Sequence, residues 1–256
     1  MTQDERRVWL IRALLEEQGY RNEIPQDVFE QKRLLRALFN VRPPTDASAE
    51  FLQVQDAYLK EAIREKGVTA LSELSPIRPH QYLWRGDITT LEVDAIVNAA
   101  NSQMLGCFAP NHSCIDNAIH TFAGVQLRLA CNEIMQRQGH EEPTGTAKIT
   151  PGFNLPAKYV LHTVGPIVRG RLTKHHEEQL ASCYRSCLKI AEENDIMSIA
   201  FCCISTGVFM FPNERAAQIA VATVNDYLKE HDGIEKVVFN VFKDMDLEIY
   251  DRLLNQ

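Results

Sequence analysis

The spacing of apolar positions divides the chain into two parts. Over residues 5–66, apolar residues recur every three or four positions, which is the period of an amphipathic helix. Turn-forming sequences at residues 19–25 and 43–46 predict three helices separated by two breaks. Residues 71–80, which include two prolines, are expected to form a connector. The clearest helical face consists of Phe51, Val54, Tyr58, Ala62 and Ile63.

Short apolar runs alternate with longer amphipathic segments after residue 80, which is the pattern of an α/β domain. The runs predict strands over residues 82–85, 95–98, 147–150, 159–164, 199–204 and 237–242. Helical spacing predicts one continuous apolar stripe over residues 115–134, a second over 180–191, and helices near 213–229 and 247–254. We therefore expect a sheet with helices on both faces over residues 81–256, and a helical extension over residues 1–80 that packs on it.

The composition is that of a folded globular chain. Its 256 residues are 45% hydrophobic and 24% charged, enough for one sizeable core plus an extension. The formal net charge of −7 opposes binding to nucleic acid, although a local basic pocket can still accept a small anion. No apolar run resembles a signal peptide or reaches the ~18 residues of a membrane span, so we expect a cytoplasmic monomer without a membrane partner. The 7 scattered cysteines suit reduced thiols and a metal better than disulfides.

Residues 106–116 concentrate metal-binding chemistry in one short segment. Cys107, His112 and Cys114 are borderline-soft donors suited to Zn²⁺, and three protein ligands leave a fourth position for water or substrate. The spacing matches none of the common zinc-finger patterns, so spacing alone leaves zinc binding and a metal-free loop both open. Asp116 follows at the start of a predicted helix, where the helix dipole also favours a carboxylate, so a structural role and a functional role are both open.

The remaining cysteines and two of the histidines are expected to be structural. Small apolar packing suits thiols on apolar faces, and His120 and His162 are expected to be packed or bonded to backbone. The cysteines on predicted helical faces are Cys131, Cys183 and Cys187, and those in a predicted strand are Cys202 and Cys203.

Two loops that follow predicted strands are candidates for ligand binding. Backbone N–H groups in residues 205–212 can hold a diphosphate, with Gly207 allowing close approach. An ordinary loop is the competing interpretation, because the sequence matches neither the P-loop nor the dinucleotide-binding fingerprint. Asp87 can accept a hydrogen bond from an adenine amino group or cap a turn. Phe242, at the end of the last predicted strand, can stack on a base or belong to the core.

In this order the segments resemble the macrodomain family, which binds ADP-ribose. The resemblance covers about residues 80–254 and implies a three-layer α/β/α fold with a mixed central sheet. The N-terminal helices and the three metal-ligand candidates resemble the zinc-dependent branch, whose bacterial members resemble protein-ADP-ribose hydrolases. Many macrodomain hydrolases carry a glycine-rich loop where this chain has residues 106–114. The motifs are GDIT at 86–89, DAIVNAAN at 94–101, IDNAIH at 115–120, TPGFNL at 150–155, YVLHTVGP at 159–166 and ISTGVF at 204–209.

The resemblance also implies roles for individual residues. Asp87 would contact the adenine amino group, Ile88 the ring through its backbone, and Phe242 would wall the base. Asn101 and Asp116 would be the catalytic residues. Asn101 would hold the distal ribose or orient the water, and Asp116 would accept a proton or hold the substrate. The diphosphate would be wrapped by Ser205, Thr206, Gly207, Val208 and Phe209.

The implied activity is zinc-dependent removal of mono-ADP-ribose from protein side chains. Zinc would either lower the pKa of bound water towards about 7 or polarise a ribose hydroxyl or the linkage oxygen, and the sequence leaves both open. The resemblance suggests linkage to acidic side chains, and a substrate of the lipoyl-carrier type that a sirtuin-type transferase has modified. The alternative is a non-catalytic reader of ADP-ribose in which zinc is structural.

Overall fold

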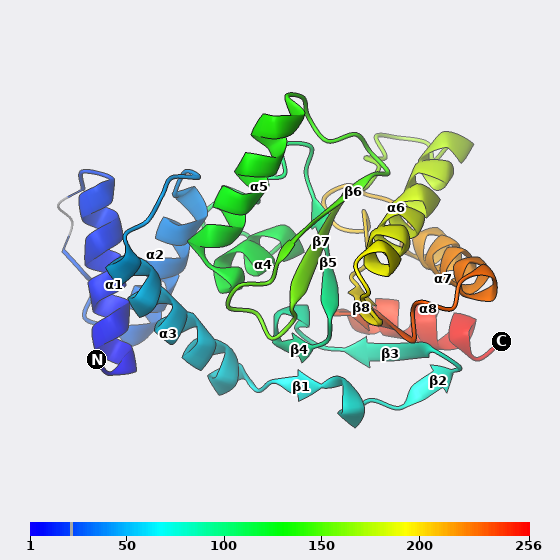
Figure 1. The fold of residues 1–256 in the computed structure, drawn as a ribbon, viewed down its shortest axis with the longest axis horizontal. Helices are drawn as coiled ribbons and strands as arrows, with labels where there is room; N and C mark the ends of the chain where they lie inside the picture. The colour runs from blue at the N-terminus through cyan, green and yellow to red at the C-terminus, as the bar shows by residue number, and fades with distance from the viewer. Residues whose placement is uncertain (21–22) are drawn as a thin grey trace.

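Three helices form the N-terminal part of the chain, as the apolar spacing predicts (Figure 1). The computed structural model describes residues 1–20 and 23–256, so residues 21 and 22 of the predicted break at 19–25 lie outside the described residues. Each helix begins where a Thr, Asp or Ser side chain accepts a hydrogen bond from the backbone of the first turn. The helices enclose a core of their own. They are α1 (Gln3–Glu17), α2 (Val28–Val41) and α3 (Ala49–Lys66).

A seven-stranded mixed sheet forms the centre of the second part, in the order β2-β3-β9-β8-β5-β7-β6. The inner pairs are parallel, and β2 and β6 are antiparallel edge strands. The strands are β2 (Pro76–Arg78), β3 (Gln81–Arg85), β5 (Ala95–Ala100), β6 (Ala147–Pro151), β7 (Tyr159–Val164), β8 (Ser198–Phe201) and β9 (Lys236–Val241). Two short strands, β1 (Thr69–Ala70) and β4 (Leu91–Glu92), pair separately, and two 3₁₀ turns are η1 (Leu71–Glu73) and η2 (Ile88–Thr90).

Five helices flank the sheet and complete the predicted three layers. In Figure 1, α4 and α5 lie on one side of the central strands and α6 and α7 on the other. The main core fills the space between the sheet and these helices, with side chains such as Ile96, Leu161 and Phe201 fully buried. The five are α4 (Ile115–Ala123), α5 (Val125–Gln138), α6 (Lys174–Glu193), α7 (Asn213–Glu230) and α8 (Asp244–Leu254).

The structure corrects three of the predicted boundaries. The stripe predicted as one helix over residues 115–134 is two helices, because Gly124 has φ +99° and ends α4. The strand predicted to end at residue 204 ends at Phe201, so Cys202 and Cys203 follow the strand; Cys203 is only half-buried. The predicted connector contributes β2 to the sheet. The division into residues 1–80 and 81–256 stays a prediction.

None of the helices within residues 1–20 and 23–256 is both long enough and apolar enough to cross a membrane.

Candidate functional site

The predicted ligand loops follow strands that are neighbours in the sheet. Strands β3, β9, β8, β5 and β7 run parallel, so their carboxyl ends meet at one edge of the sheet. Asp87 follows β3, Asn101 follows β5 and Phe242 follows β9. Ligands bind at this edge in open α/β sheets. The fold therefore brings the predicted adenine, ribose and diphosphate contacts to one face of the molecule.

Asp87 caps the turn η2, which was one of its two predicted roles. Its Oδ1 accepts hydrogen bonds from the backbone N of Thr89 (3.0 Å) and from Thr89 Oγ1 (2.6 Å). Its Oδ2 accepts a hydrogen bond from Lys66 Nζ (2.7 Å) at the end of α3. Burial raises the pKa of Asp87, but the hydrogen bonds from Lys66 and Thr89 and the Lys66 charge outweigh it, so the pKa is lowered overall. An ionised carboxylate therefore faces the ligand edge, and the adenine contact itself stays a prediction.

The other predicted adenine contacts differ in exposure. Phe242 is 74% exposed, which excludes the core role left open by the sequence and leaves its ring free to stack. Ile88 is 1% exposed, so its side chain belongs to the core, and the backbone contact with the adenine ring stays a prediction.

The loop over residues 205–209 leaves room for an anion. A Cβ added at Gly207 would meet no atom within 4 Å, and Val208 is 70% exposed. Ser205 has φ +65°, and its buried Oγ lacks a hydrogen-bond partner in the part of the chain described. The backbone of Phe209 is held in turn by the N–H of Val168, at 2.9 Å. A strained residue in a loop that a neighbouring segment holds in place is often found in ligand-binding segments.

The three metal-ligand candidates converge in space. The ligand atoms of Cys107, His112 and Cys114 all lie within 4.8 Å of one another, and all three residues are half-buried. Burial, together with the nearby Cys107 and Asp116, raises the pKa of the Cys114 thiol to about 12, against the lowering effect of the backbone N–H of Asn117. A bound dication would offset the repulsion among the two thiolates and the Asp116 carboxylate. The donor set therefore fits Zn²⁺ in chemical type and in spacing.

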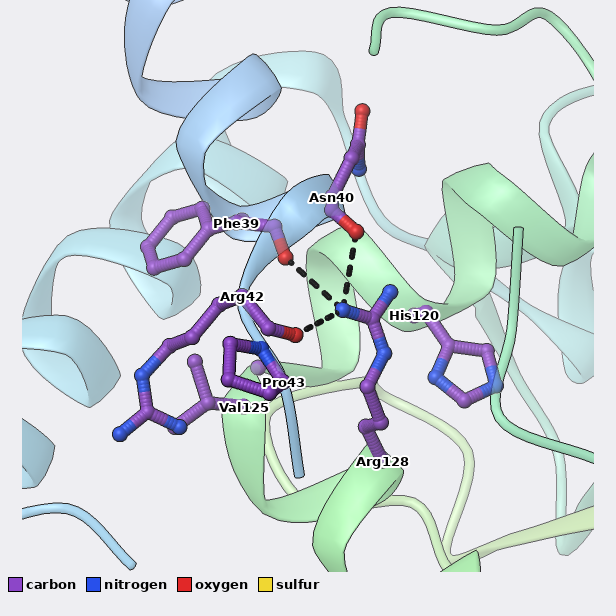
Figure 2. Close-up of a pocket in the computed structure, with 8 residues that line it drawn as sticks. Phe39, Asn40, Arg42, Pro43, His120, Val125 and Arg128 are labelled. Atoms are coloured by element: carbon purple, nitrogen blue, oxygen red, sulfur yellow. Dashed lines mark hydrogen bonds between the residues drawn. The ribbon is translucent and has the colours of Figure 1, made fainter. Parts of the chain in front are cut away.

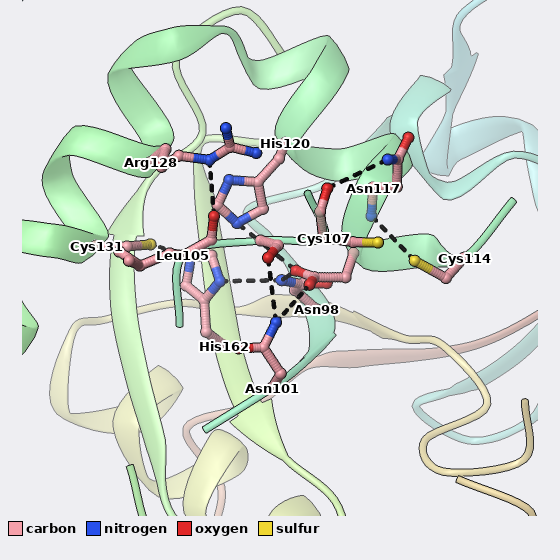
Figure 3. Close-up of polar contacts among 12 residues, drawn as sticks. Asn98, Asn101, Leu105, Cys107, Cys114, Asn117, His120, Arg128, Cys131 and His162 are labelled. Carbon is pink, nitrogen blue, oxygen red and sulfur yellow. Dashed lines mark hydrogen bonds and ion pairs between the residues drawn. The ribbon is translucent and has the colours of Figure 1, made fainter. Parts of the chain in front are cut away.

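Asn98 and Asn101 lie beside this loop (Figure 3), and both contact Asp116. Asp116 Oδ1 accepts a hydrogen bond from Asn98 Nδ2 (2.8 Å), and Asp116 Oδ2 accepts one from Asn101 Nδ2 (3.3 Å). Asn101 Nδ2 also donates to the carbonyl of Gly106 (3.2 Å). Burial raises the pKa of Asp116 to about 6, against the lowering effect of Asn98, Arg128 and Asn101. Asp116 is 5% exposed, so this geometry suits a carboxylate that orients Asn101.

A second group of possible metal ligands lies deeper in the molecule. Ligand atoms of His120, Cys131 and His162 also lie within 4.8 Å of one another. His162 is already satisfied, because Nδ1 lies 3.1 Å from Asn98 Nδ2 and Nε2 lies 2.9 Å from Thr150 Oγ1. Burial lowers the pKa of His162 to about 3. The packed role predicted for His162 is thus correct, but its partners are side chains and not backbone.

Sequence reasoning missed the residues that hold the metal loop (residues 101–114) against the N-terminal helices. Arg36 and Asn40 reach it from α2, and Asn117 lies in the first turn of α4. Asn98 was also missed, although a buried asparagine in an apolar strand is a sequence signal for a specific polar contact. Arg36 offered no such signal, since it lies among other charged residues on a helix.

A small cavity marks the seam between α2 and the helices α4 and α5 (Figure 2). Its volume is about 10 Å³, which holds one water at most, so it is not the ligand site. Arg128 lies beside it and donates hydrogen bonds to the carbonyls of Phe39 (3.3 Å), Asn40 (2.9 Å) and Arg42. This cation binds the carboxyl end of α2, where the helix dipole favours positive charge.

The fold and the clustered loops define an α/β protein whose candidate ligand site lies at the carboxyl edge of its sheet. The Macro domain model matches residues 97–220. A Treponema medium protein named Protein-ADP-ribose hydrolase is 60% identical over 261 residues, covering 100% of both chains. A Staphylococcus aureus protein of the same name is 54% identical, covering 90% of this chain and 86% of the relative. The chain belongs to the macrodomain family.

Solved structures support the same conclusion about the fold. The Trypanosoma brucei macrodomain in complex with ADP-ribose is 31% identical, with a TM-score of 0.67, covering 85% of this chain and 94% of that one. A mutant Oceanobacillus iheyensis macrodomain with ADPR is 38% identical, with a TM-score of 0.64, covering 71% and 95%. The predicted macrodomain fold is therefore confirmed.

Proposed function

We propose that this protein hydrolyses the bond between ADP-ribose and a protein side chain, with Zn²⁺ held by Cys107, His112 and Cys114. The observation that carries the proposal is the meeting of these three donors with Asn101 and Asp116 at the edge where the ligand loops gather. Two relatives at 60% and 54% identity bear the name Protein-ADP-ribose hydrolase.

Each part of ADP-ribose has a matching segment in the chain. The Asp87 carboxylate accepts a hydrogen bond from the adenine amino group, and the exposed ring of Phe242 stacks on the base. The diphosphate lies in the 205–209 loop, where the open space beside Gly207 lets backbone amides approach the phosphate oxygens. The distal ribose then points towards Asn101 and the metal loop.

In the proposed reaction, water adds to the anomeric carbon of the distal ribose while the side-chain oxygen leaves. One water is consumed, and ADP-ribose and a free carboxyl group are released. Asn101 orients the ribose or the water, and Asp116 holds the Asn101 amide in place from 3.3 Å. When bound at Cys107, His112 and Cys114, Zn²⁺ supplies Lewis-acid activation of water or of a sugar or linkage oxygen.

The linkage and the protein substrate are proposed from the resemblance to the zinc-dependent branch. They are an acidic side chain and a lipoyl-carrier-type protein modified by a sirtuin-type transferase.

The deciding experiment follows release of ADP-ribose from mono-ADP-ribosylated proteins of defined linkage, with and without a strong chelator. We expect release from an acidic linkage, loss of release after chelation, and recovery with added Zn²⁺. Cys107→Ala should abolish the metal-dependent release, whereas Cys203→Ala, outside the donor set, should retain it. Absence of release from every linkage would overturn the hydrolase, and release insensitive to chelation would overturn the zinc mechanism.

A reader of ADP-ribose with a structural zinc is the alternative function, favoured by the position of the donors in a loop that the metal would pin. A catalytic metal and a structural metal respond differently to Cys107→Ala. Loss of turnover with ADP-ribose binding retained supports catalysis. Parallel loss of thermal stability and of ADP-ribose binding supports the structural role.

A further inference from the structure

We propose that Arg36 of α2 is a positioning residue for the metal-binding loop, and that it acts through Asn117. This inference rests on the proposed zinc site at Cys107, His112 and Cys114. It gives the N-terminal helices a part in metal binding.

Asn117 holds both cysteines of the loop from one position. It is 0% exposed and lies three residues after Cys114, whose Sγ accepts a hydrogen bond from its backbone N–H (3.4 Å). Its side-chain Nδ2 donates to the carbonyl of Cys107 (3.3 Å) and to the carbonyl of Ala109 (3.0 Å). One buried residue therefore fixes the backbone at the start of the loop and the thiol at its end.

Arg36 determines which way the Asn117 amide faces. Its Nε and Nη2 both donate to Asn117 Oδ1, at 3.2 Å and 2.8 Å. With Oδ1 turned to the guanidinium, Nδ2 can only turn to the loop carbonyls. The same Nη2 donates to the carbonyl of His112 (3.0 Å), so Arg36 also touches the backbone of the third donor residue. Each donor residue is thus contacted by Arg36 or by Asn117.

The loop needs such external fixing because it has little structure of its own. Residues 101–114 form no helix or strand, and Asn111 has φ +56°. Asn40, one turn after Arg36 in α2, accepts a hydrogen bond from the backbone N of Asn111 (2.9 Å). Ordering a backbone costs conformational entropy, so donors in a loose loop would bind a metal less tightly than donors held in place.

The test compares full-length wild type with Arg36→Gln, Arg36→Lys and a control on the same helix, Arg33→Gln. Arg33 is exposed, forms an ion pair with Glu30 (3.5 Å) and lies over the Phe29 ring (5.9 Å), both on α2 itself. Zinc affinity is measured by competition with a chromophoric chelator, and Co²⁺ absorption reports tetrahedral thiolate coordination. Loss of an outer-shell partner typically weakens metal binding about 10–100-fold, which we expect for Arg36→Gln. The zinc affinity of Arg36→Lys should lie between those of wild type and Arg36→Gln, because an ammonium group cannot reproduce the guanidinium hydrogen bonds to both Asn117 and His112. Arg33→Gln should match wild type.

The possible outcomes separate this inference from the proposed function. Wild type that binds neither metal overturns the zinc site itself. Wild type that binds zinc, with Arg36→Gln equally tight, overturns only the positioning role. Should Arg36→Gln fail to fold, Arg36→Lys decides: wild-type metal affinity refutes the role, and weakened affinity with unchanged melting temperature in chelator supports it.

Discussion

Replacing Arg128 by methionine should destabilise the protein strongly, because this one side chain joins three segments. Arg128 is 5% exposed and donates to the carbonyl of Leu105 in the metal loop (2.7 Å) and to carbonyls at the end of α2. Its guanidinium also lies 4.1 Å from the centre of the Phe108 ring. The carbonyl groups of Asn40 and Arg42 belong to residues that are 1% and 3% exposed.

The magnitude follows from the acceptors left behind. A buried acceptor that loses its partner costs about 1–3 kcal/mol, and the adjoining cavity of about 10 Å³ admits one water at most. Two orphaned carbonyls give about 2–6 kcal/mol. Part of this loss of unfolding free energy is offset, because burying the guanidinium is itself unfavourable. The same burial lowers the pKa of Arg128 to about 10. We expect Arg128→Met to lower the unfolding free energy by about 3 kcal/mol.

Urea unfolding followed by circular dichroism, with a chelator present, measures this change directly. The control is Arg137→Met, also on α5, whose exposed side chain donates only to the carbonyl of Glu133 (3.2 Å) among the described residues. A surface change of this kind should stay within about 0.5 kcal/mol. An Arg128→Met variant within about 1 kcal/mol of wild type would refute the reasoning.

Three further predictions concern His162, Gly106 and Ser205. The pKa of His162 is lowered to about 3, so between about pH 6 and pH 4 the histidine is protonated in the unfolded chain but not in the folded one. The unfolding free energy should therefore fall by about 1.4 kcal/mol for each pH unit as the pH is lowered through this range. His162→Gln should remove this contribution to the pH dependence of the unfolding free energy, measured by urea unfolding at several pH values. An unchanged pH dependence would contradict the prediction. Gly106 has φ +78°, and the methyl group of Gly106→Ala would lie 2.7 Å from the buried ring of His120. The control is Gly139→Ala, at φ +74°, whose methyl group would meet no atom within 4 Å. Both should lose about 1–2 kcal/mol of stability in urea unfolding, with a further loss only for Gly106→Ala; equal losses would argue against the clash. Ser205→Gly should raise the melting temperature, equivalent to about 0.5–1 kcal/mol, and weaken ADP-ribose binding by calorimetry. Unchanged affinity would remove Ser205 from the diphosphate contacts.

The sequence was sufficient for most of the fold because each element has a strong local pattern. The strand over residues 159–164 is observed with those bounds, and the helix expected to begin at residue 213 does so. The break at Gly124 was missed because the apolar period continues across it. In the fold, Gln55 Oε1 accepts a hydrogen bond from the backbone N of Val125, the first residue of α5. Periodicity reports the buried face and not the hydrogen bonds along it.

The sequence was sufficient to predict that the three metal-ligand candidates lie together, but not which residues hold them in place. Cys107, His112 and Cys114 lie within ten residues, so sequence proximity brings them together. Arg36 lies 81 positions before Asn117, and no local pattern connects a helix-surface arginine to a distant amide. Lys66 and Asp87 are likewise paired only once α3 packs against the sheet. Long-range polar contacts depend on the assembled fold, which a one-dimensional pattern does not contain.

The pairing of β2 with β3 has a consequence for how this chain can be divided. A chain shortened to begin at residue 81 would lose β2 and β1, and with them one of the two strand partners of β3 and the partner of β4. The uncovered edge of β3 would offer free backbone groups to other molecules, which invites aggregation. A shortened chain that keeps this edge covered must therefore retain Pro76–Arg78, and transplanting the sheet without them would require a new edge strand.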